Sequence, residues 1–275
     1  MTSILTNHSA MVALSTLNDV NRSLNETQNR VSSGLAIRSG KENAAYFAIS
    51  ETMKGDSGMF KAINEGMTAT RNSVATARLG AETVADLAEQ MVERIAFGVS
   101  DGVNQDDVQL ELDALAANML SAVNQATFNG DDLVTGTAAV SVVNGVTRSG
   151  GFAVTTFSFN QVDLSAIQGV LDGIDLAGAA DATARAALLT TAEAQLGLAI
   201  DAATSFGITE NTLDNQMQFI DSLTDTLDSG ISSMVDADME EEAARLQAFQ
   251  VQQQLATQSL SIANQAPQNI LTLFR

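Results

Sequence analysis

The sequence predicts a mainly α-helical fold. Long, coiled-coil-like helices from both chain ends pack together, and a small β-hairpin region and a short variable segment lie mid-chain. Alanine and unbranched side chains dominate the 275 residues, and Pro267 is the only proline, so few residues oppose helix formation. Aromatic residues make up 4% of the chain and Trp is absent, which argues against a large compact core.

The first helix is expected from Ala10 to Leu35, where positions alternate in steps of four and three, as in a heptad seam. Polar side chains interrupt this seam at Asn21 and Gln28. A seam Asn costs stability but fixes register or partner number, so we interpret Asn21 as a specificity device. The alternative is a partly exposed position in an ordinary amphipathic helix. The whole predicted seam is Ala10, Leu14, Leu17, Asn21, Leu24, Gln28, Val31 and Leu35.

Two further helices are predicted before the middle of the chain. Ser and Gly residues indicate a loop or hinge near residues 33–43, and Glu42 begins a helical stretch that reaches about Phe97. Asn104 is a plausible N-cap for a segment reaching about Thr127. We expect these two helices to pair antiparallel.

The mid-chain composition predicts strands. Asn129-Gly130 and Asn144-Gly145 are the strongest turn signals, because both central positions of a type I′ turn need positive φ. The residues near them, 140–143, 146–148 and 152–159, are rich in β-branched and aromatic side chains. Helical composition then returns at about residues 183–233, and a last helix runs from after Asp236 toward Pro267.

The last helix carries two apolar stripes, whereas an isolated amphipathic helix needs one. A helix that is apolar on two faces must be packed from two sides. The second partner is then another copy of the chain, or, as the alternative, more of the same molecule. One stripe is Ala244, Ala248, Val251, Leu255 and Ile262, and the other is Leu246, Phe249, Ala256, Leu260 and Ala263.

The net charge of −20 argues against a nucleic-acid partner and is unevenly distributed. Residues 1–45 sum to +1 and residues 234–275 to −3, so −18 falls on residues 46–233. Interfaces tolerate single-sign charge less well than solvated surfaces do. We therefore expect the middle of the chain to face water and the ends to be covered.

The sequence offers little for catalysis, cofactors or metals. His8 is the only histidine and cysteine is absent, which excludes thiolate sites and the H-E-x-x-H motif. No phosphate-binding glycine loop and no G-x-S-x-G elbow occurs. The acidic run from Asp236 to Glu242 is interpreted as a helix N-terminus rather than a cation site. Without these motifs we expect no enzyme and no cofactor. No signal-peptide pattern and no apolar stretch long enough to span a bilayer is found, so we also expect no segment inserted in a membrane.

Motifs at both ends resemble those of bacterial flagellins. Residues 30–37 (RVSSGLAI) and 39–45 (SGKENAA) resemble the family signature R-L-S-S-G-L-R-I-x-S-A-K-D-D-A-A. Residues 236–239 (DADM) and 263–275, which end in Leu-Phe-Arg, resemble its closing motif, and residues 128–130 match its F-N-G turn. Where the family has D-D-A-A-G-L, residues 42–47 read ENAAYF, as in flagellins of the alphaproteobacterial type.

The resemblance implies a role for each part of the chain in a flagellar filament used for swimming. Residues 1–44 and 234–275 would form the inner tube, 45–135 and 185–233 the next shell, and 136–184 the variable outer segment. The resemblance also implies contacts of the polymerising ends. The residues expected there are Leu14, Leu17, Asn21, Leu24, Val31, Leu35, Leu246, Phe249, Val251, Leu255, Leu260, Ile262, Ile270, Leu271, Leu273 and Phe274.

Partners and location also follow from the resemblance. The partners would be other copies of the chain, the flagellar cap and hook-associated proteins, an export chaperone and the flagellar type III secretion apparatus. The protein would be extracellular and exported without a cleaved signal peptide. Three alternatives remain: a hook-filament junction protein, an enzyme displayed on the filament through residues 136–184, and a self-contained intracellular helical bundle with protease-resistant ends.

A prediction concerns the family surface R-V-R-E-L-A that an animal innate immune receptor recognises, which appears here as residues 91–96, MVERIA. Met91 replaces a recognition arginine, which removes charge and bidentate hydrogen bonding. We expect weak or absent receptor activation in a reporter-cell assay. A response equal to that of a potent flagellin would contradict this expectation.

Overall fold

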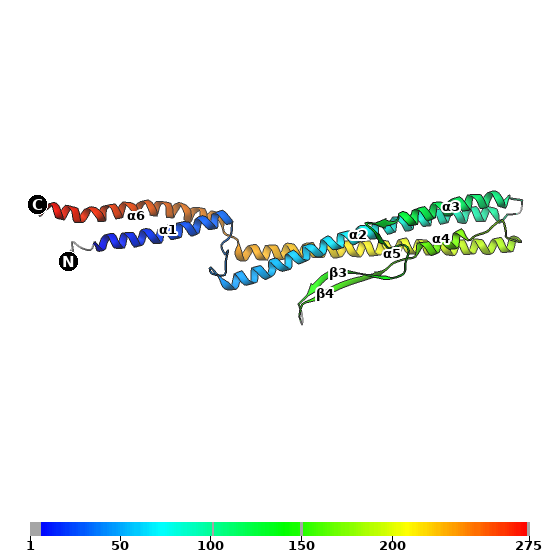
Figure 1. Cartoon of the computed structure of the whole chain (residues 1–275), viewed down its shortest axis with the longest axis horizontal. Coiled ribbons are helices and arrows are strands. Elements are labelled where there is room, and N and C mark those ends of the chain that lie inside the picture. Colours follow the sequence, from blue (N-terminus) through cyan, green and yellow to red (C-terminus); the bar gives the residue numbers. More distant parts are fainter. Residues whose placement is uncertain (1–6, 101, 149–150, 274–275) are drawn as a thin grey trace. The chain divides into compact units, whose positions relative to one another are not determined.

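The computed structural model describes residues 7–100, 102–148 and 151–273, with side-chain surroundings up to residue 265. Long helices dominate, as predicted, and two short antiparallel sheets lie mid-chain (Figure 1). The elements are α1 (His8–Ser33), α2 (Ala44–Gly98), α3 (Gln105–Gln125), β1 (Thr127–Phe128), β2 (Asp131–Asp132), β3 (Ala139–Thr147), β4 (Ala153–Asn160), α4 (Leu164–Asp172), α5 (Ala182–Val235) and α6 (Met239–Leu273).

The chain divides into two compact units, and α2 and α5 each contribute a segment to both. Unit 1 comprises residues 1–57 and 226–275, and unit 2 comprises residues 58–225. This division comes from contacts within the chain. The finer division into inner, shell and outer segments that the resemblance implies remains a prediction.

In unit 1, α1 and α6 lie side by side and run antiparallel (Figure 1). The Asn7 side chain caps the start of α1 by accepting a hydrogen bond from the Ala10 amide. Gly34 ends α1 in the left-handed conformation, φ 72°, and its N–H donates to the Arg30 carbonyl at 2.8 Å. That conformation suits glycine because it has no Cβ.

Two linkers of unit 1, after α1 and before α6, hold each other through main-chain hydrogen bonds. The Ala36 N–H donates to the Val235 carbonyl at 2.7 Å, and the Ala237 N–H donates to the Gly34 carbonyl at 2.9 Å. Further along the first linker, the Arg38 N–H donates to the Glu42 carboxylate at 2.6 Å, and this bond lowers the pKa of Glu42. The expected hinge region is therefore an ordered connection in this unit.

Unit 2 is a helical bundle with an apolar core. The α2 and α3 segments pair antiparallel, as predicted: Arg94 of α2 forms an ion pair with Glu111 of α3 at 3.1 Å, and Gly80 lies against Ala126. Across the bundle, Arg78 of α2 forms an ion pair with Glu210 of α5 at 2.8 Å. The largest fully buried side chains of this core are Phe206, Met67, Met91, Ile95, Leu112, Met119, Leu164, Leu171, Leu176, Leu213, Ile220 and Val74.

The predicted turn at Asn129-Gly130 is confirmed. Both residues have positive φ, 52° and 87°, and they join β1 to β2. Beyond the turn, burial alone would raise the pKa of Asp132. Hydrogen bonds from the Thr135 hydroxyl and from the Val134 and Thr135 amides outweigh that effect and lower it.

The predicted turn at Asn144-Gly145 is wrong, because both residues lie inside the continuous strand β3. This strand pairs antiparallel with β4, and the register shifts between Val143 and Gly145. A β-bulge also favours glycine: a Cβ at Gly145 would lie 2.9 Å from the Thr155 hydroxyl oxygen. The same dipeptide thus marks a turn at one site and a bulge at the other.

Helix α4 was not predicted. It is nine residues long and packs its apolar side, Leu164, Ile167 and Leu171, into the core against α3. The side chain of Gln109 on α3 holds the segment that follows: its amide nitrogen donates to the Ile174 carbonyl at 3.0 Å, and its oxygen accepts from the Leu176 N–H at 2.8 Å.

Two glycines of α2 in unit 2 are expected to respond oppositely to the same substitution. A Cβ at Gly66 would meet nothing within 4 Å, so Gly66→Ala should stabilise the unit by about 0.5–1 kcal/mol through helix propensity. A Cβ at Gly80 would collide with Ala126, so Gly80→Ala should destabilise it by about 1–3 kcal/mol. Thermal unfolding followed by circular dichroism measures both, and changes of the same sign would contradict the packing described.

Candidate polymerisation interface

The helical hairpin of α1 and α6 is held by an apolar seam. On α6, the side chains that face α1 are half-buried or buried and recur in steps of three and four. They form the second of the two predicted stripes, joined by Gln253. The seam of α6 consists of Leu246, Phe249, Gln253, Ala256, Leu260 and Ala263.

On α1 the predicted seam coincides only in part with the side that α6 covers. Leu17, Leu24 and Val31 face the partner helix, but Leu14 and Gln28 are exposed. At these two places the preceding residues, Ala13 and Thr27, are covered instead. The covered residues of α1 are Ala10, Ala13, Leu17, Val20, Asn21, Leu24, Thr27, Arg30 and Val31.

Polar groups fix the register of this hairpin at three levels. The Gln253 amide donates to the Asn21 side-chain oxygen at 2.6 Å, and the Asn7 amide donates to the Ala263 carbonyl at 2.7 Å. Near the other end, Arg30 reaches the buried carboxylate of Glu242 at 3.4 Å. A seam with many alanines would tolerate slippage, whereas each of these bonds is lost if the helices shift by one turn.

The acidic residues before and at the start of α6 lie at a helix N-terminus, as the sequence predicts. The Asp238 carboxylate accepts hydrogen bonds from the amides of Glu240 and Glu241 at 2.9 and 3.2 Å. Glu242 also accepts from Arg245 at 3.0 Å, so its buried oxygen is shared by two guanidinium groups. Among the described residues, no group of His, Cys, Asp and Glu side chains is arranged to hold a metal ion.

The other apolar stripe of α6 is left uncovered by the chain. Val251, Leu255 and Ile262 are 54%, 61% and 61% exposed. At 3.6 residues per turn these positions fall on a side of α6 that the seam does not cover. One apolar face of α6 is therefore satisfied by α1, and the other has no partner within the described unit.

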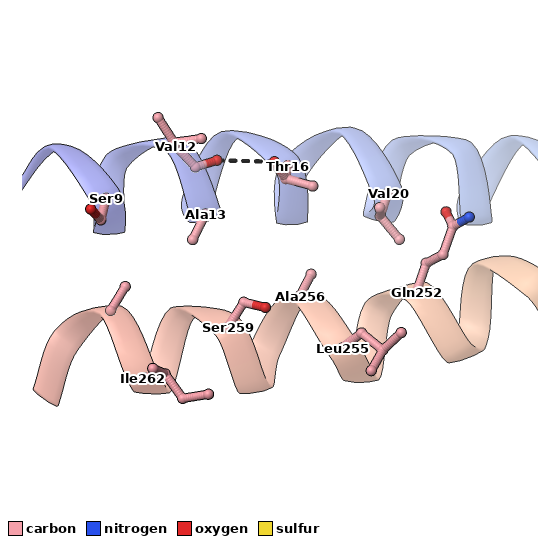
Figure 2. A pocket seen from close by; sticks show the side chains of 11 residues that line it. Ser9, Val12, Ala13, Thr16, Val20, Gln252, Leu255, Ala256, Ser259 and Ile262 are labelled. Atoms are coloured by element: carbon pink, nitrogen blue, oxygen red, sulfur yellow. Dashed lines mark hydrogen bonds between the residues drawn. The ribbon is translucent and has the colours of Figure 1, made fainter. Parts of the chain in front are cut away.

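A groove runs along the hairpin beside this stripe. It has a volume of about 710 Å³ and is lined by both helices. Figure 2 shows Ala13 and Ala256 pointing toward the opposite helix, whereas Val12, Leu255 and Ile262 point away from it. The remaining lining is small or polar: Ser9, Thr16, Val20, Gln252, Ser259 and Ala263.

The residues predicted at the interface fall into three groups. Leu17, Asn21, Leu24, Val31, Leu246, Phe249 and Leu260 lie in the seam within the chain, and Leu35 lies in the bridge between the linkers. Leu14, Val251, Leu255 and Ile262 are exposed. The backbone of Ile270, Leu271 and Leu273 continues α6, their side chains and Phe274 lying outside what the structure describes.

Sequence reasoning missed two exposed apolar residues of α1, Met11 and Val12. Both stand outside the heptad steps, and a search for apolar residues off the seam would have found them.

Within the described residues no helix is long and apolar enough to cross a bilayer. Met91 belongs to residues 91–96, for which we expect weak or absent activation of the immune receptor. It lies in the core of unit 2, where it is 1% exposed.

A helical hairpin that packs one apolar face internally and leaves a second uncovered defines a structural subunit suited to self-association. A family model described as the bacterial flagellin N-terminal helical region matches residues 4–139, and one described as the C-terminal helical region matches residues 187–274. The flagellin of Brucella melitensis biotype 1 is 37% identical over 284 residues, covering 100% of both chains. Flagellin C of Rhizobium meliloti (strain 1021) is 33% identical over 321 residues, again covering 100% of both.

The chain therefore belongs to the bacterial flagellin family, and it is a structural subunit of the flagellar filament. A solved structure from Vibrio parahaemolyticus, described as a flagellar hook-associated protein, has a TM-score of 0.50 at 12% identity. It covers 67% of this chain and 95% of that one, which shows a shared fold.

The hydrogen bond between Asn21 and Gln253 generates a prediction. Because it crosses the seam, Asn21→Ala and Gln253→Ala should show a coupling of about 0.5–1.5 kcal/mol in a double-mutant cycle. Hydrogen exchange of α1 and α6 amides in assembled protein measures the cycle. As a control, Asn25→Ala and Gln247→Ala change exposed amides of the same two helices and should be additive. A coupling no larger than that of the control pair would show that the bond does not fix the register.

Proposed function

We propose that the filament grows when the exposed stripe of α6, with Val12 and the groove beside it, packs against other copies of the chain. The observation that carries this proposal is the exposure of Val251, Leu255 and Ile262 on a helix whose opposite face is already packed. Burying a Val, Leu or Ile side chain contributes about 1.5–3 kcal/mol, so a few such residues contribute several kcal/mol per subunit.

The two apolar faces would act in one assembly step. The ends of the free monomer are disordered in this proposal, and they fold on joining the filament tip. The seam through Leu17, Leu24 and Val31 then orders each hairpin, while the exposed stripe joins it to its neighbours. Burial on both faces offsets the entropy lost when the ends become ordered.

The domain assignment of the resemblance supplies the larger arrangement. Residues 1–44 and 234–275 would line the inner tube, and residues 45–135 and 185–233 would form the shell. The uneven charge supports this order: the ends are weakly charged, and unit 2 contains 22 of the 33 acidic residues. Residues 136–184, which include β3, β4 and α4, would face outward.

Export and partners follow from the same proposal. The flagellar type III secretion apparatus would carry the unfolded chain, without a cleaved signal, to an extracellular filament. The absence of cysteine suits that passage, since no disulfide could form before export. An export chaperone, the flagellar cap and hook-associated proteins would be the other partners, and the role is structural rather than enzymatic.

The runner-up within the same superfamily is a hook-filament junction protein. This alternative is supported by the solved structure that shares the fold, which is described as hook-associated. The full-length likeness to curated flagellins favours the filament subunit. Counting copies in sheared appendages separates the two, since a junction protein is needed only in small number.

Substitution of Leu255 tests the proposal. Leu255→Asp places a charge on the exposed stripe, where a neighbouring copy would have to desolvate it. We expect secreted protein that fails to form filaments, as judged by electron microscopy and sedimentation. Gln250→Asp adds the same side chain at an exposed position of α6 that does not line the groove, and should polymerise normally.

A second substitution separates the two faces. Leu24 is only 7% exposed, in the seam of a single hairpin, so Leu24→Asp should also yield secreted monomers but through loss of hairpin pairing. Normal filaments from Leu255→Asp would refute the proposed interface, whatever Leu24→Asp does.

A further inference from the structure

The β3–β4 hairpin carries little charge although it belongs to an acidic unit. Unit 2 carries six cationic and 22 acidic residues, yet residues 133–162 contain a single charged side chain, Arg148. Every residue of β3 and of β4 is uncharged, and β-branched and aromatic side chains are frequent in both strands. Repulsion between the acidic surfaces of two copies of unit 2 is therefore weaker around this hairpin.

Strand β4 is an edge strand without the usual protection against pairing. It pairs with β3 on one side, and in the part of the chain that the structure describes no strand pairs with its other side. Natural edge strands are blunted by charged residues, prolines or bulges. The bulge of this hairpin lies in β3, where the Asn144 carbonyl also accepts a hydrogen bond from Gln216 of α5 at 3.3 Å. Strand β4 has no bulge, no proline and no charge.

The two faces of the hairpin differ in a way that leaves β4 accessible. Phe157 and Phe159 stack with ring centroids 6.2 Å apart and pack against the core of unit 2. On the opposite face, Val154, Thr156 and Ser158 are exposed, Val154 by 51%. Strand β4 is thus anchored on one side while its outer face and its free edge remain open to another strand.

We propose that β4 pairs antiparallel with β4 of a second copy of this chain, which joins two hairpins into one four-stranded sheet. Main-chain hydrogen bonds along the free edges supply the attraction, as in other strand-addition interfaces. A second copy fits this edge because it presents the same uncharged strand, whereas the rest of its unit 2 is repelled. A segment rich in Val, Thr and Phe without charge or proline is also the composition that favours strand-to-strand association.

The symmetry of the contact tells which copies it joins. An antiparallel pairing of one strand with itself has a two-fold axis, so both copies use the same surface. Subunits of a helical filament point the same way and meet through different surfaces. The β4 contact therefore links subunits of two filaments lying side by side. This step rests on the proposed filament role, and many weak copies of the contact along two filaments would add up.

Single cysteines test the pairing directly, because the natural chain has none. Residues opposite each other in an antiparallel pair have Cβ atoms about 4.5–5.5 Å apart, so a shift of about 1 Å brings two facing cysteines to the Cβ separation of a disulfide, about 3.5–4.5 Å. Val154→Cys, Thr156→Cys and Ser158→Cys are each oxidised mildly in full-length filaments, with Thr204→Cys on an exposed position of α5 as the control. We expect at least one β4 variant to form disulfide-linked dimers several-fold faster than the control. Equal rates at all four positions would overturn the proposal.

A charge substitution tests the consequence for filaments. We expect filaments of the natural chain to bundle side by side in electron microscopy and light scattering. Thr156→Lys protects the edge of β4 and should abolish this bundling, while single filaments still grow. Thr204→Lys makes the same change elsewhere in unit 2 and should leave bundling unchanged. Bundling of Thr156→Lys filaments at the control level would sink the inference. The Leu255→Asp variant tests filament growth, and the Thr156→Lys variant tests only the contact between filaments. Each proposal can therefore be refuted without the other.

Discussion

The structure of the chain ends depends on one constraint: α6 is apolar on two faces, and α1 can cover only one of them. The seam through Leu246, Phe249 and Leu260 is satisfied by α1, and the stripe through Leu255 and Ile262 remains in water. The pairing of α1 with α6 does not depend on this exposed stripe. The free energy gained by removing the stripe from water can come only from contact with a second molecule. Pairing with α1 therefore buries one apolar face of α6 and leaves the other exposed.

The polar bonds across the seam gain their meaning from that arrangement. Apolar contacts of small seam residues such as Ala10, Ala13 and Ala256 would change little if the helices slid past each other, because small side chains interlock weakly. The bond from Gln253 to Asn21 and the contact of Arg30 with Glu242 are lost on sliding. Val12 on α1 and Ile262 on α6 line one groove only in the correct register. The polar groups thus align the surface that we propose packs against a neighbouring copy.

Much of this could be predicted from local sequence, and the failures have physical causes. The two-stripe pattern of α6 was readable because 3.6-residue periodicity places each apolar residue on a face without knowledge of the partner. The seam of α1 was shifted at Leu14 and Gln28, since alanine and threonine at Ala13 and Thr27 face the partner but carry little hydrophobic signal. The sequence predicts a turn at Asn144-Gly145 because glycine is common in both turns and bulges, and only the pairing with β4 decides between them. Helix α4 is too short for its periodicity to distinguish it from a buried strand.

Charge is distributed unevenly between the two units, and this affects how copies of the chain associate. Unit 1 has seven cationic and eleven acidic residues, whereas unit 2 has six and 22, so repulsion between copies acts mainly through unit 2. Apolar burial at the ends must outweigh that repulsion for any polymer to form, and salt, which screens exposed charges over about 8–10 Å, favours close approach of the acidic surfaces. Strands β3 and β4 break the pattern, because neither carries a charge in so acidic a unit. The edge of β4 therefore lacks electrostatic protection, and it is there that we propose two assembled surfaces meet.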